Sequence, residues 1–248
     1  MSKVLIFGAS GLVGTQLTLI ASRDHSVVAA CNTRRPSCIN SIKVDATKME
    51  DVVRSIVQVA PDSIIYAAGL QHASKENMDL VNAGAMISIA SAANEVGSRV
   101  LYLSSDAVYC GTMPPYYEDS PVNPVSDYGK SKLFGEQMTA KCNNFCVARL
   151  ALVKQNPLPK TPFSNEYRTP VDINFACEAM VRLATERTPH KVYNVGGPER
   201  MSRSQLVANI TGFAVEGTIC EDASRPTDCS MDSSRLNHFL RGEEQCAG

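Results

Sequence analysis

The stretch KVLIFGASGLVGTQLTLIA (3–21) joins an apolar run to a segment with helical spacing through a glycine-rich turn. VLIF (4–7) predicts a short, fully apolar strand, and the residues from Leu12 onward predict a helix. Between the two stand three glycines at three-residue spacing, Gly8, Gly11 and Gly14. Such a turn lets the backbone approach a pyrophosphate, which the free N–H groups at the helix N-terminus attract. The stretch therefore predicts a dinucleotide-binding turn, which we favour over a tight turn that holds no ligand.

Short apolar runs continue to alternate with amphipathic segments as far as residue 150. Strands are predicted at 26–31, 42–44, 63–69, 99–105 and 145–150, and helices at 49–60, 78–96 and 126–141. The strand segments are apolar on both sides, as strands covered on two faces require. The alternation predicts an α/β fold, a Rossmann-type doubly wound parallel sheet with a small C-terminal substrate lobe.

The pattern becomes looser after residue 150. KQNPLPKTPFSNEYRTP (154–170) is rich in proline and polar residues and predicts a loop. A helix at about 173–186, a strand at 191–197 and a helix at 202–211 follow, and a short helix ends the chain. We therefore assign 1–150 to an NADP(H)-binding Rossmann domain and 151–248 to a small substrate-binding lobe packed on it.

Composition excludes several classes of function. The 248 residues carry a formal net charge of −1, which argues against a nucleic-acid partner and an anionic membrane. No stretch reaches the length of a membrane span, and the N-terminal apolar run is too short for a signal peptide. The nine cysteines form no Cys-x-x-Cys pair and the four histidines lie far apart. We therefore expect free thiols in a reducing, cytoplasmic setting and no metal site.

The end of the second predicted strand bears on the choice of cofactor. It continues as Asn32, Thr33, Arg34 and Arg35, without the carboxylate that binds the ribose 2′-hydroxyl of NAD. Two guanidinium groups can instead bind a 2′-phosphate, which predicts NADP(H) in preference to NAD(H). The alternative is that both arginines belong to a solvated loop.

Tyr128 and Lys132 stand four residues apart in a predicted helix, so their side chains share one face. The pair alone is a weak signal, because short motifs of this kind often arise by chance. An ammonium group near a phenol lowers the pKa of the phenol. Tyr128 could then act as a general acid that protonates a carbonyl oxygen. Ser105, at the end of the strand LYLSS, could donate a hydrogen bond to the same oxygen.

Several separated motifs, in order, resemble the extended branch of the short-chain dehydrogenase/reductase superfamily. They are GASGLVG (8–14), Asp45, YAAG (66–69), VNA (81–83), LYLSSDAVYCG (101–111), PVNPVSDYGKSKLFGE (121–136), YNVGGPERMSRSQL (193–206) and RPTDCSMDSSRL (225–236). Within that branch the chain is most similar to the dTDP-4-dehydrorhamnose reductase group and to the related regulatory β subunit of methionine adenosyltransferase. The resemblance covers the chain nearly from end to end.

The resemblance implies an NAD(P)-dependent oxidoreductase with Ser105, Tyr128 and Lys132 as its catalytic residues. It also implies that Lys132 holds the nicotinamide ribose and that Asn82 lies near the cofactor, although Asn82 could equally be a helix-surface or capping amide. The predicted cofactor contacts are Gly8, Ser10, Gly11, Leu12, Val13, Asn32, Arg34, Arg35, Asp45, Ala46, Ala67, Ala68, Gly69, Asn82, Tyr128 and Lys132.

The predicted substrate contacts are Ser105, Asp106, Arg168 and Arg225, the two arginines as partners of a substrate phosphate. Structural salt bridges are an equally good interpretation of both arginines. Two functions stay open: an NADPH-dependent reductase of a 4-keto nucleotide sugar, favoured by the retained catalytic residues, and a non-catalytic NADP-binding regulatory subunit, favoured by the short lobe. A nucleotide-sugar epimerase or dehydratase is less favoured. Neither a homodimer nor a partner enzyme is excluded.

Overall fold

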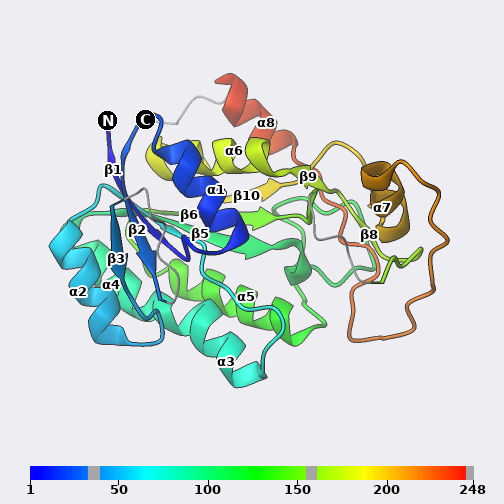
Figure 1. Ribbon diagram of the computed structural model, residues 1–248, viewed down its shortest axis with the longest axis horizontal. Coiled ribbons are helices and arrows are strands. Elements are labelled where there is room, and N and C mark those ends of the chain that lie inside the picture. Colours follow the sequence, from blue (N-terminus) through cyan, green and yellow to red (C-terminus); the bar gives the residue numbers. More distant parts are fainter. Residues whose placement is uncertain (33–39, 155–160, 244–248) are drawn as a thin grey trace.

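The central feature of the computed structural model, which describes residues 1–32, 40–154 and 161–243, is a parallel sheet of seven strands (Figure 1). The strand order is β10-β6-β5-β4-β1-β2-β3. The strands are β1 (Lys3–Phe7), β2 (Ser26–Cys31), β3 (Ser41–Lys43), β4 (Ser63–Tyr66), β5 (Arg99–Ser105), β6 (Phe145–Leu150) and β10 (Val192–Val195). Strands β1 to β6 have the spatial order of a Rossmann fold, β3-β2-β1-β4-β5-β6, so the predicted fold class is confirmed.

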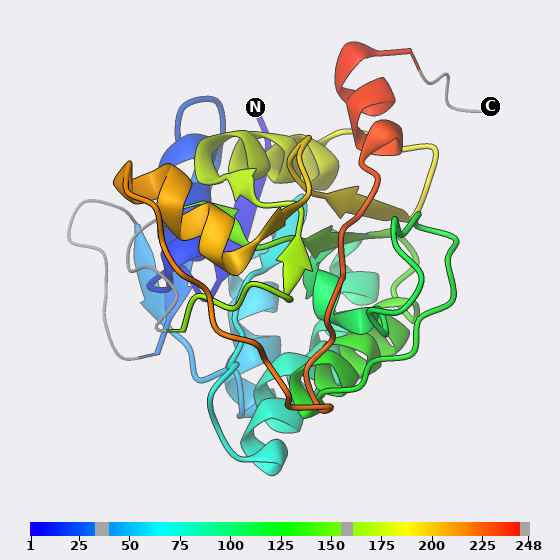
Figure 2. The same cartoon turned by 90° about the vertical axis from the view of Figure 1, so that its right-hand side faces the viewer.

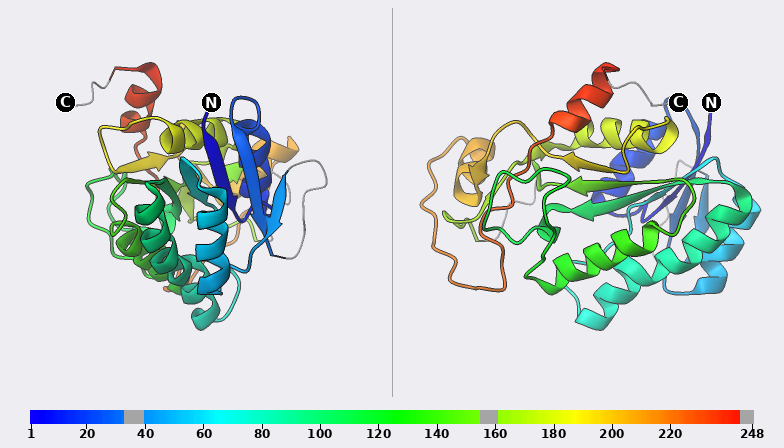
Figure 3. Two further views of the ribbon diagram at one scale, coloured as in Figure 1. Left: turned by 90° about the vertical axis from the view of Figure 1, so that its left-hand side faces the viewer. Right: turned by 180° about the vertical axis from the view of Figure 1, so that it is seen from behind.

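Helices cover both faces of the sheet (Figures 1 and 3). On one face lie α1 (Leu12–Ala21), α6 (Ile173–Thr185) and α8 (Ser234–Arg241), and on the other lie α2 (Met49–Val59), α4 (Ala85–Val96) and α5 (Asp127–Thr139). Each layer closes its own hydrophobic cluster against the sheet. Every residue of β4 and β5 is buried, because a strand covered on both faces has no exposed side.

The helix predicted over 78–96 is interrupted. It consists of α3 (Lys75–Asp79), a π-helical turn at Leu80–Gly84 and α4. A π-helical turn adds a residue to the helical ladder and is frequent at functional sites. Here it holds Asn82, whose side chain is fully buried beneath the loop that follows β4.

The C-terminal part of the chain contributes both to the main layers and to a small projection beyond them. β10 pairs with β6, and α6 packs beside α1, so these two elements complete the sheet and its helical layer. The projection contains β8 (Tyr167–Arg168), β11 (Met201–Ser202) and α7 (Arg203–Thr211), and Figure 2 shows it end-on. The domain boundary at residue 150 stays a prediction.

The predicted loop 154–170 is less irregular than its sequence indicates. Tyr167 and Arg168 pair with β11 as an antiparallel ladder, and β7 (Val153–Lys154) pairs with β9 (Val171–Asp172). Two-residue strands leave no periodic pattern in a sequence, which is why they escape prediction. Residues 155–160 lie outside the described part of the chain.

Candidate active site

The predicted site residues gather at one edge of the sheet. Gly8 follows β1, Asn32 follows β2, Ala67 follows β4 and Ser105 ends β5. Because all strands of the sheet are parallel, their carboxyl ends meet at the same edge, beside the switch point between β1 and β4. The fold therefore places the glycine turn next to the residues expected to act on a substrate.

The glycine turn has the close backbone approach that its sequence predicts. Gly8 has φ +77°, and a Cβ atom built on it would lie 2.5 Å from the backbone nitrogen of Ala68. A Cβ on Gly14 would lie 2.1 Å from the carbonyl oxygen of Gly8, so Gly14 serves the packing of α1 on β1. Gly11 is the N-cap of α1, and no side chain caps that end. The N-terminal N–H groups of α1 are thus available to a diphosphate, and the turn fits a dinucleotide.

The adenosine end of the expected cofactor site is only partly described. Asn32 is exposed directly after β2, whereas Arg34 and Arg35 lie outside the described residues. Asp45 accepts hydrogen bonds from the backbone nitrogen and the hydroxyl of Thr47, at 3.0 and 2.7 Å. These hydrogen bonds lower the pKa of Asp45. Asp45 and the adjacent Ala46 are half-buried beyond β3.

Asn82 is a buried clamp between two segments of the site. Its Oδ1 accepts a hydrogen bond from the backbone nitrogen of Leu70 at 2.8 Å, and its Nδ2 donates to the carbonyl oxygen of Leu70 at 2.9 Å. Nδ2 also donates to the hydroxyl of Ser131 on α5 at 2.8 Å. Asn82 is therefore neither a helix-surface nor a capping amide: it fixes the loop after Gly69 to the helix that carries Tyr128.

Ser105 and Tyr128 meet at the end of β5. The Ser105 hydroxyl donates to Oδ1 of Asp106 at 3.0 Å and accepts from the backbone nitrogen of Ala107 at 3.2 Å. Ser126 caps α5 by accepting a hydrogen bond from a backbone N–H of its first turn, so Tyr128 lies within that turn. The Tyr128 side chain is hydrogen-bonded to Ser105.

Burial shifts the pKa values of Tyr128 and Lys132 in opposite directions. Burial raises the pKa of Tyr128 to about 12, and the charge of Asp106 adds to the rise while the hydrogen bond with Ser105 opposes it. Burial lowers the pKa of Lys132 to about 7 against the charge of Glu136. Lys132 is not among the groups that shift the pKa of Tyr128 here, so the expected lowering of the phenol pKa by Lys132 stays a prediction. Tyr128 is a protonated phenol, the form that donates a proton.

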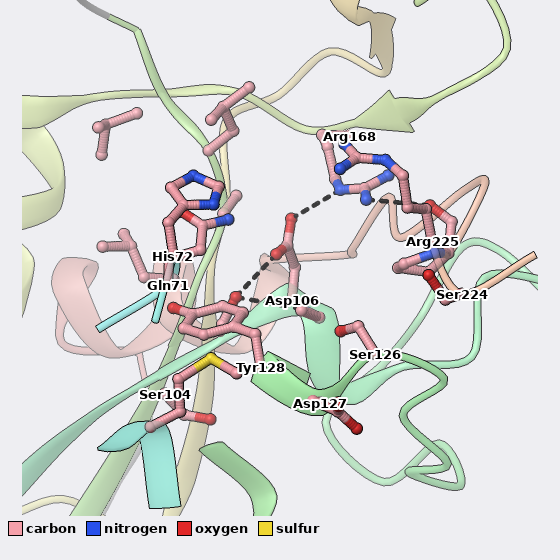
Figure 4. Close-up of a pocket in the computed structure, with 18 of the residues that line it drawn as sticks. Gln71, His72, Ser104, Asp106, Ser126, Asp127, Tyr128, Arg168, Ser224 and Arg225 are labelled. Atoms are coloured by element: carbon pink, nitrogen blue, oxygen red, sulfur yellow. Dashed lines mark hydrogen bonds and ion pairs between the residues drawn. The ribbon is translucent and has the colours of Figure 1, made fainter. Parts of the chain in front are cut away.

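A cleft of about 460 Å³ opens in front of these residues (Figure 4). It is lined by Val13, Gln71, His72, Met78, Ser104, Ser105, Asp106, Ala107, Ser126, Asp127, Tyr128, Leu150, Ala151, Leu152, Val153, Arg168, Arg203, Asp222, Ser224, Arg225 and Pro226. Figure 4 shows Asp106 between Tyr128 and Arg168, with His72 on the wall opposite Arg225. The cleft therefore joins the catalytic candidates to both predicted arginines.

Asp106 is 7% exposed, and only one of its two carboxylate oxygens accepts a hydrogen bond within the described residues. Its Oδ2 lies 3.3 Å from Nε of Arg168, an ion-pair distance, yet within the described residues this oxygen accepts no hydrogen bond. Burial raises the pKa of Asp106, while the Arg168 charge and the Ser105 hydroxyl oppose the rise. Arg168 itself donates to the carbonyl oxygens of Tyr167 and Pro226, at 2.6 and 3.0 Å.

The second predicted arginine belongs to a cluster around Glu166. Arg225 donates to both carboxylate oxygens of Glu166, and Nε of Arg203 lies 2.6 Å from Oε2. Burial opposes ionisation of Glu166, but the hydrogen bonds from Arg225 and the charges of Arg203 and Arg168 outweigh it and lower its pKa. Nε of Arg203 makes no hydrogen bond within the described part of the chain. Both predicted arginines thus form structural ion pairs and also line the cleft.

Sequence reasoning missed several polar residues of this site, among them Arg203, Glu166, His72 and Gln71. Arg203 follows the N-cap Ser202, and Glu166 stands in the segment predicted as a loop. Gln71 and His72 directly follow the strand that ends in the predicted cofactor contacts, and this position was the only signal that could have revealed them. No group of three or more described His, Cys, Asp and Glu side chains could hold a metal ion. No described helix is long and apolar enough to cross a membrane.

The family described as RmlD substrate binding domain matches residues 2–194. The chain belongs to this family. It is 29% identical to the dTDP-4-dehydrorhamnose reductase of Salmonella typhimurium over 86% of its own length and 67% of the reductase. It is 30% identical to the methionine adenosyltransferase 2 subunit beta of Rattus norvegicus, over 97% of its own length and 83% of that subunit.

Solved structures of similar proteins have the same fold. A hypothetical dTDP-4-dehydrorhamnose reductase from Sulfolobus tokodaii superposes with a TM-score of 0.85 and 28% identity, over 96% of this chain and 94% of that one. A dTDP-4-dehydrorhamnose reductase from Bacillus anthracis in complex with NADP has a TM-score of 0.79 and covers 98% of this chain and all of that one, but at 18% identity it shows the fold alone. The family, the fold and the predicted class of NAD(P)-dependent oxidoreductase are confirmed.

Proposed function

We propose that the protein is an NADPH-dependent reductase of a 4-keto nucleotide sugar. The observation that carries the proposal is the meeting of Ser105, Tyr128 and Lys132 with a glycine turn at one sheet edge, in front of a cleft lined by arginines. Each part alone is weak evidence, but together they supply a cofactor site, a proton donor and an anion-binding wall.

The residues of the turn and the neighbouring strand ends fit the cofactor. Gly8, Ser10, Gly11, Leu12 and Val13 would hold the diphosphate, and Ala67, Ala68 and Gly69 would line its path. Asn32, Arg34, Arg35, Asp45 and Ala46 would hold the adenosine end, with the arginines favouring the 2′-phosphate of NADP(H) over NAD(H). When bound, the cofactor supplies a hydride to the substrate carbonyl carbon.

The chain's own residues supply the proton and orient the carbonyl group. Tyr128, a phenol that is protonated at neutral pH and whose pKa burial raises further, would donate its proton to the carbonyl oxygen. The Ser105 hydroxyl, now directed at Asp106, would turn to donate a hydrogen bond to that oxygen. Lys132 would hold the nicotinamide ribose and stabilise the phenolate that Tyr128 leaves behind.

The rest of the cleft would hold the sugar and its phosphates. Arg168 and Arg225 carry the charge to bind a diphosphate, with Arg203 beside them. Oδ2 of Asp106 is ion-paired with Arg168 but accepts no hydrogen bond from the described residues, and a sugar hydroxyl would donate one to it. The arginines and the Asp106 oxygen together favour a ligand that is both anionic and hydroxylated.

The test is NADPH oxidation in the presence of a panel of 4-keto nucleotide sugars, with dTDP-4-dehydrorhamnose as the first member. We expect turnover that requires a sugar and falls by at least about 10²-fold in Tyr128→Phe, which keeps the ring and removes the proton donor. Tyr117→Phe, an exposed tyrosine outside the cleft, is the matched control. Tight NADPH binding without turnover on any sugar would contradict the proposal, and equal affinity for NADH would contradict the role of Arg34 and Arg35.

A second function is supported by one specific observation, the 30% identity to a methionine adenosyltransferase β subunit over nearly the whole chain. On this alternative the protein binds NADP(H) without turnover and associates with a partner enzyme. Size-exclusion chromatography of the protein mixed with a methionine adenosyltransferase catalytic subunit tests it. Co-elution that needs NADPH, in a protein inactive on every sugar, would favour the regulatory function.

A further inference from the structure

The face of α5 that carries Tyr128 and Lys132 continues for one more turn to Glu136. The three residues are spaced i, i+4 and i+8, so their side chains form one row along the helix. Lys132 is 4% exposed and Glu136 is 8% exposed. Buried charges at this spacing interact strongly, because little water screens them.

The carboxylate of Glu136 is held from two sides. The hydroxyl of Ser104 donates to Oε1. The guanidinium of Arg149 donates hydrogen bonds to both oxygens, from Nε to Oε1 at 3.0 Å and from Nη2 to Oε2 at 2.9 Å. Ser104 precedes the catalytic candidate Ser105 on β5, and Arg149 lies on β6. Glu136 thus ties α5 to the two strands at whose ends the site opens.

Arg149 is itself anchored in the protein interior. Its Nη1 donates to the Tyr109 hydroxyl at 2.9 Å and to the carbonyl oxygen of Glu118 at 3.0 Å. Tyr109 donates in turn to Oδ1 of Asn194 on β10 at 2.8 Å. With its partners fixed in this way, the Glu136 carboxylate cannot move freely toward Lys132.

We propose that Glu136 is a positioning residue of the active site, whose carboxylate, restrained by Arg149 and Ser104, keeps the Lys132 amine charged and aligned with Tyr128. The carboxylate is near enough to favour the ammonium form, while Arg149 prevents it from closing on the amine as a direct ion pair. The ammonium group would then stay available to a ribose hydroxyl and to the phenolate.

The surroundings of Lys132 leave Glu136 as the nearby acid in the described structure. On its own helix the other titratable groups are Tyr128, one turn earlier, and the exposed ion pair of Asp127 with Lys130. From β5 the ring of Tyr102 lies under Nζ, 4.7 Å from its centroid. The loop after β4 and the π-helical turn present neutral groups, Gly69 and Asn82. Burial lowers the pKa of Lys132 to about 7, and the charge of Glu136 acts against it.

The decisive experiment is an NMR titration of the full chain labelled with ¹³C and ¹⁵N lysine, in which Lys132→Met assigns the signal and exposed Lys130 serves as reference. We expect Lys132 to titrate roughly one pH unit lower in Glu136→Gln than in the wild type, because the favourable charge is lost. In Arg149→Gln we expect the opposite shift, because the carboxylate is released toward the amine. Glu136→Asp should restore most of the wild-type value.

Opposite shifts separate this role from a purely structural one, since both variants weaken the same ion pair and would lower thermal stability alike. Unchanged titration of Lys132 in both folded variants, or a shift in the same direction, would overturn the proposal. If Glu136→Gln does not fold, Glu136→Asp and Arg149→Gln supply the comparison. The role in catalysis rests on the proposed function, but the titration needs neither cofactor nor substrate, so the two can fail separately.

Discussion

Two buried carboxylates lie near Tyr128, and their surroundings differ. Glu136 receives hydrogen bonds from Ser104 and from both ends of the Arg149 fork. Asp106 receives one from Ser105, and its other oxygen is ion-paired with Arg168 but accepts no hydrogen bond from the described residues. A buried polar atom without a hydrogen-bond partner costs free energy, so its presence calls for an explanation such as a ligand, a water or a catalytic role. The comparison separates two parts of the site. Glu136 belongs to its framework, the buried residues that join α5 to β5 and β6, whereas Asp106 belongs to the lining of the cleft.

The difference has a cause in the fold. Glu136 lies between an inner helix and two central strands, where every neighbour is supplied by the chain itself. Asp106 opens the short helical turn after β5, at the sheet edge where all parallel strands stop. Beyond this edge the chain offers only part of the hydrogen bonding that a buried carboxylate needs.

The largest effect on stability is expected from Glu136→Leu. This change leaves Arg149 buried without its countercharge, and removal of one partner of a buried ion pair costs about 3–5 kcal/mol. Urea denaturation followed by circular dichroism measures the loss. A change near zero would mean that Glu136 is not part of the framework, and Glu178→Leu, at an exposed ion pair with Arg23, is the matched control.

A smaller effect on stability but a clear effect on activity is expected from Asp106→Asn. Asp106→Asn removes the countercharge of the buried Arg168. Arg168 keeps its hydrogen bonds to carbonyl oxygens and the nearby charge of Glu166, so the free energy of unfolding should fall by less than in Glu136→Leu. Turnover of a sugar substrate should fall, because the amide presents a poorer acceptor to a substrate hydroxyl. If Asp106→Asn lost as much stability as Glu136→Leu, both carboxylates would be structural, and the distinction between them would be wrong.

The smallest effect is a pH dependence of NADPH binding. Lys132 has a pKa of about 7 in the free protein, so its amine is charged below pH 7 and neutral above it. A cofactor bound by the charged amine raises that pKa, and the complex then takes up a proton as it forms above pH 7. Affinity should therefore fall by up to about tenfold per pH unit as the pH rises through 7.

Calorimetry in two buffers of different ionisation enthalpy measures this proton uptake at pH 8. Lys132→Met should abolish the component that appears above pH 7 while leaving any titration of the cofactor phosphate in place. Proton uptake that persists in Lys132→Met would assign the effect to another group.

Local patterns were enough to predict much of this site. The three glycines, the apolar strands and the spacing of Tyr128 and Lys132 are each visible within a few residues, and the structure brings them to one edge. Glu136 and Arg149 were not recognised as a pair, since 13 residues and a turn separate them along the chain. Glu166 and Arg225 meet across 59 residues, a contact that no spacing rule reveals.

The sequence by itself determined the parallel sheet, the glycine turn and the residue types of the catalytic candidates, because short-range periodicity and backbone sterics fix these locally. Only the tertiary structure decided how far the pKa values of those groups shift: burial among distant segments raises the pKa of Tyr128 to about 12 and lowers the pKa of Lys132 to about 7. It also decided which carboxylate is satisfied and which faces the cleft. Solvation and long-range charge depend on what packs around a side chain, and that is settled only when the whole chain has folded.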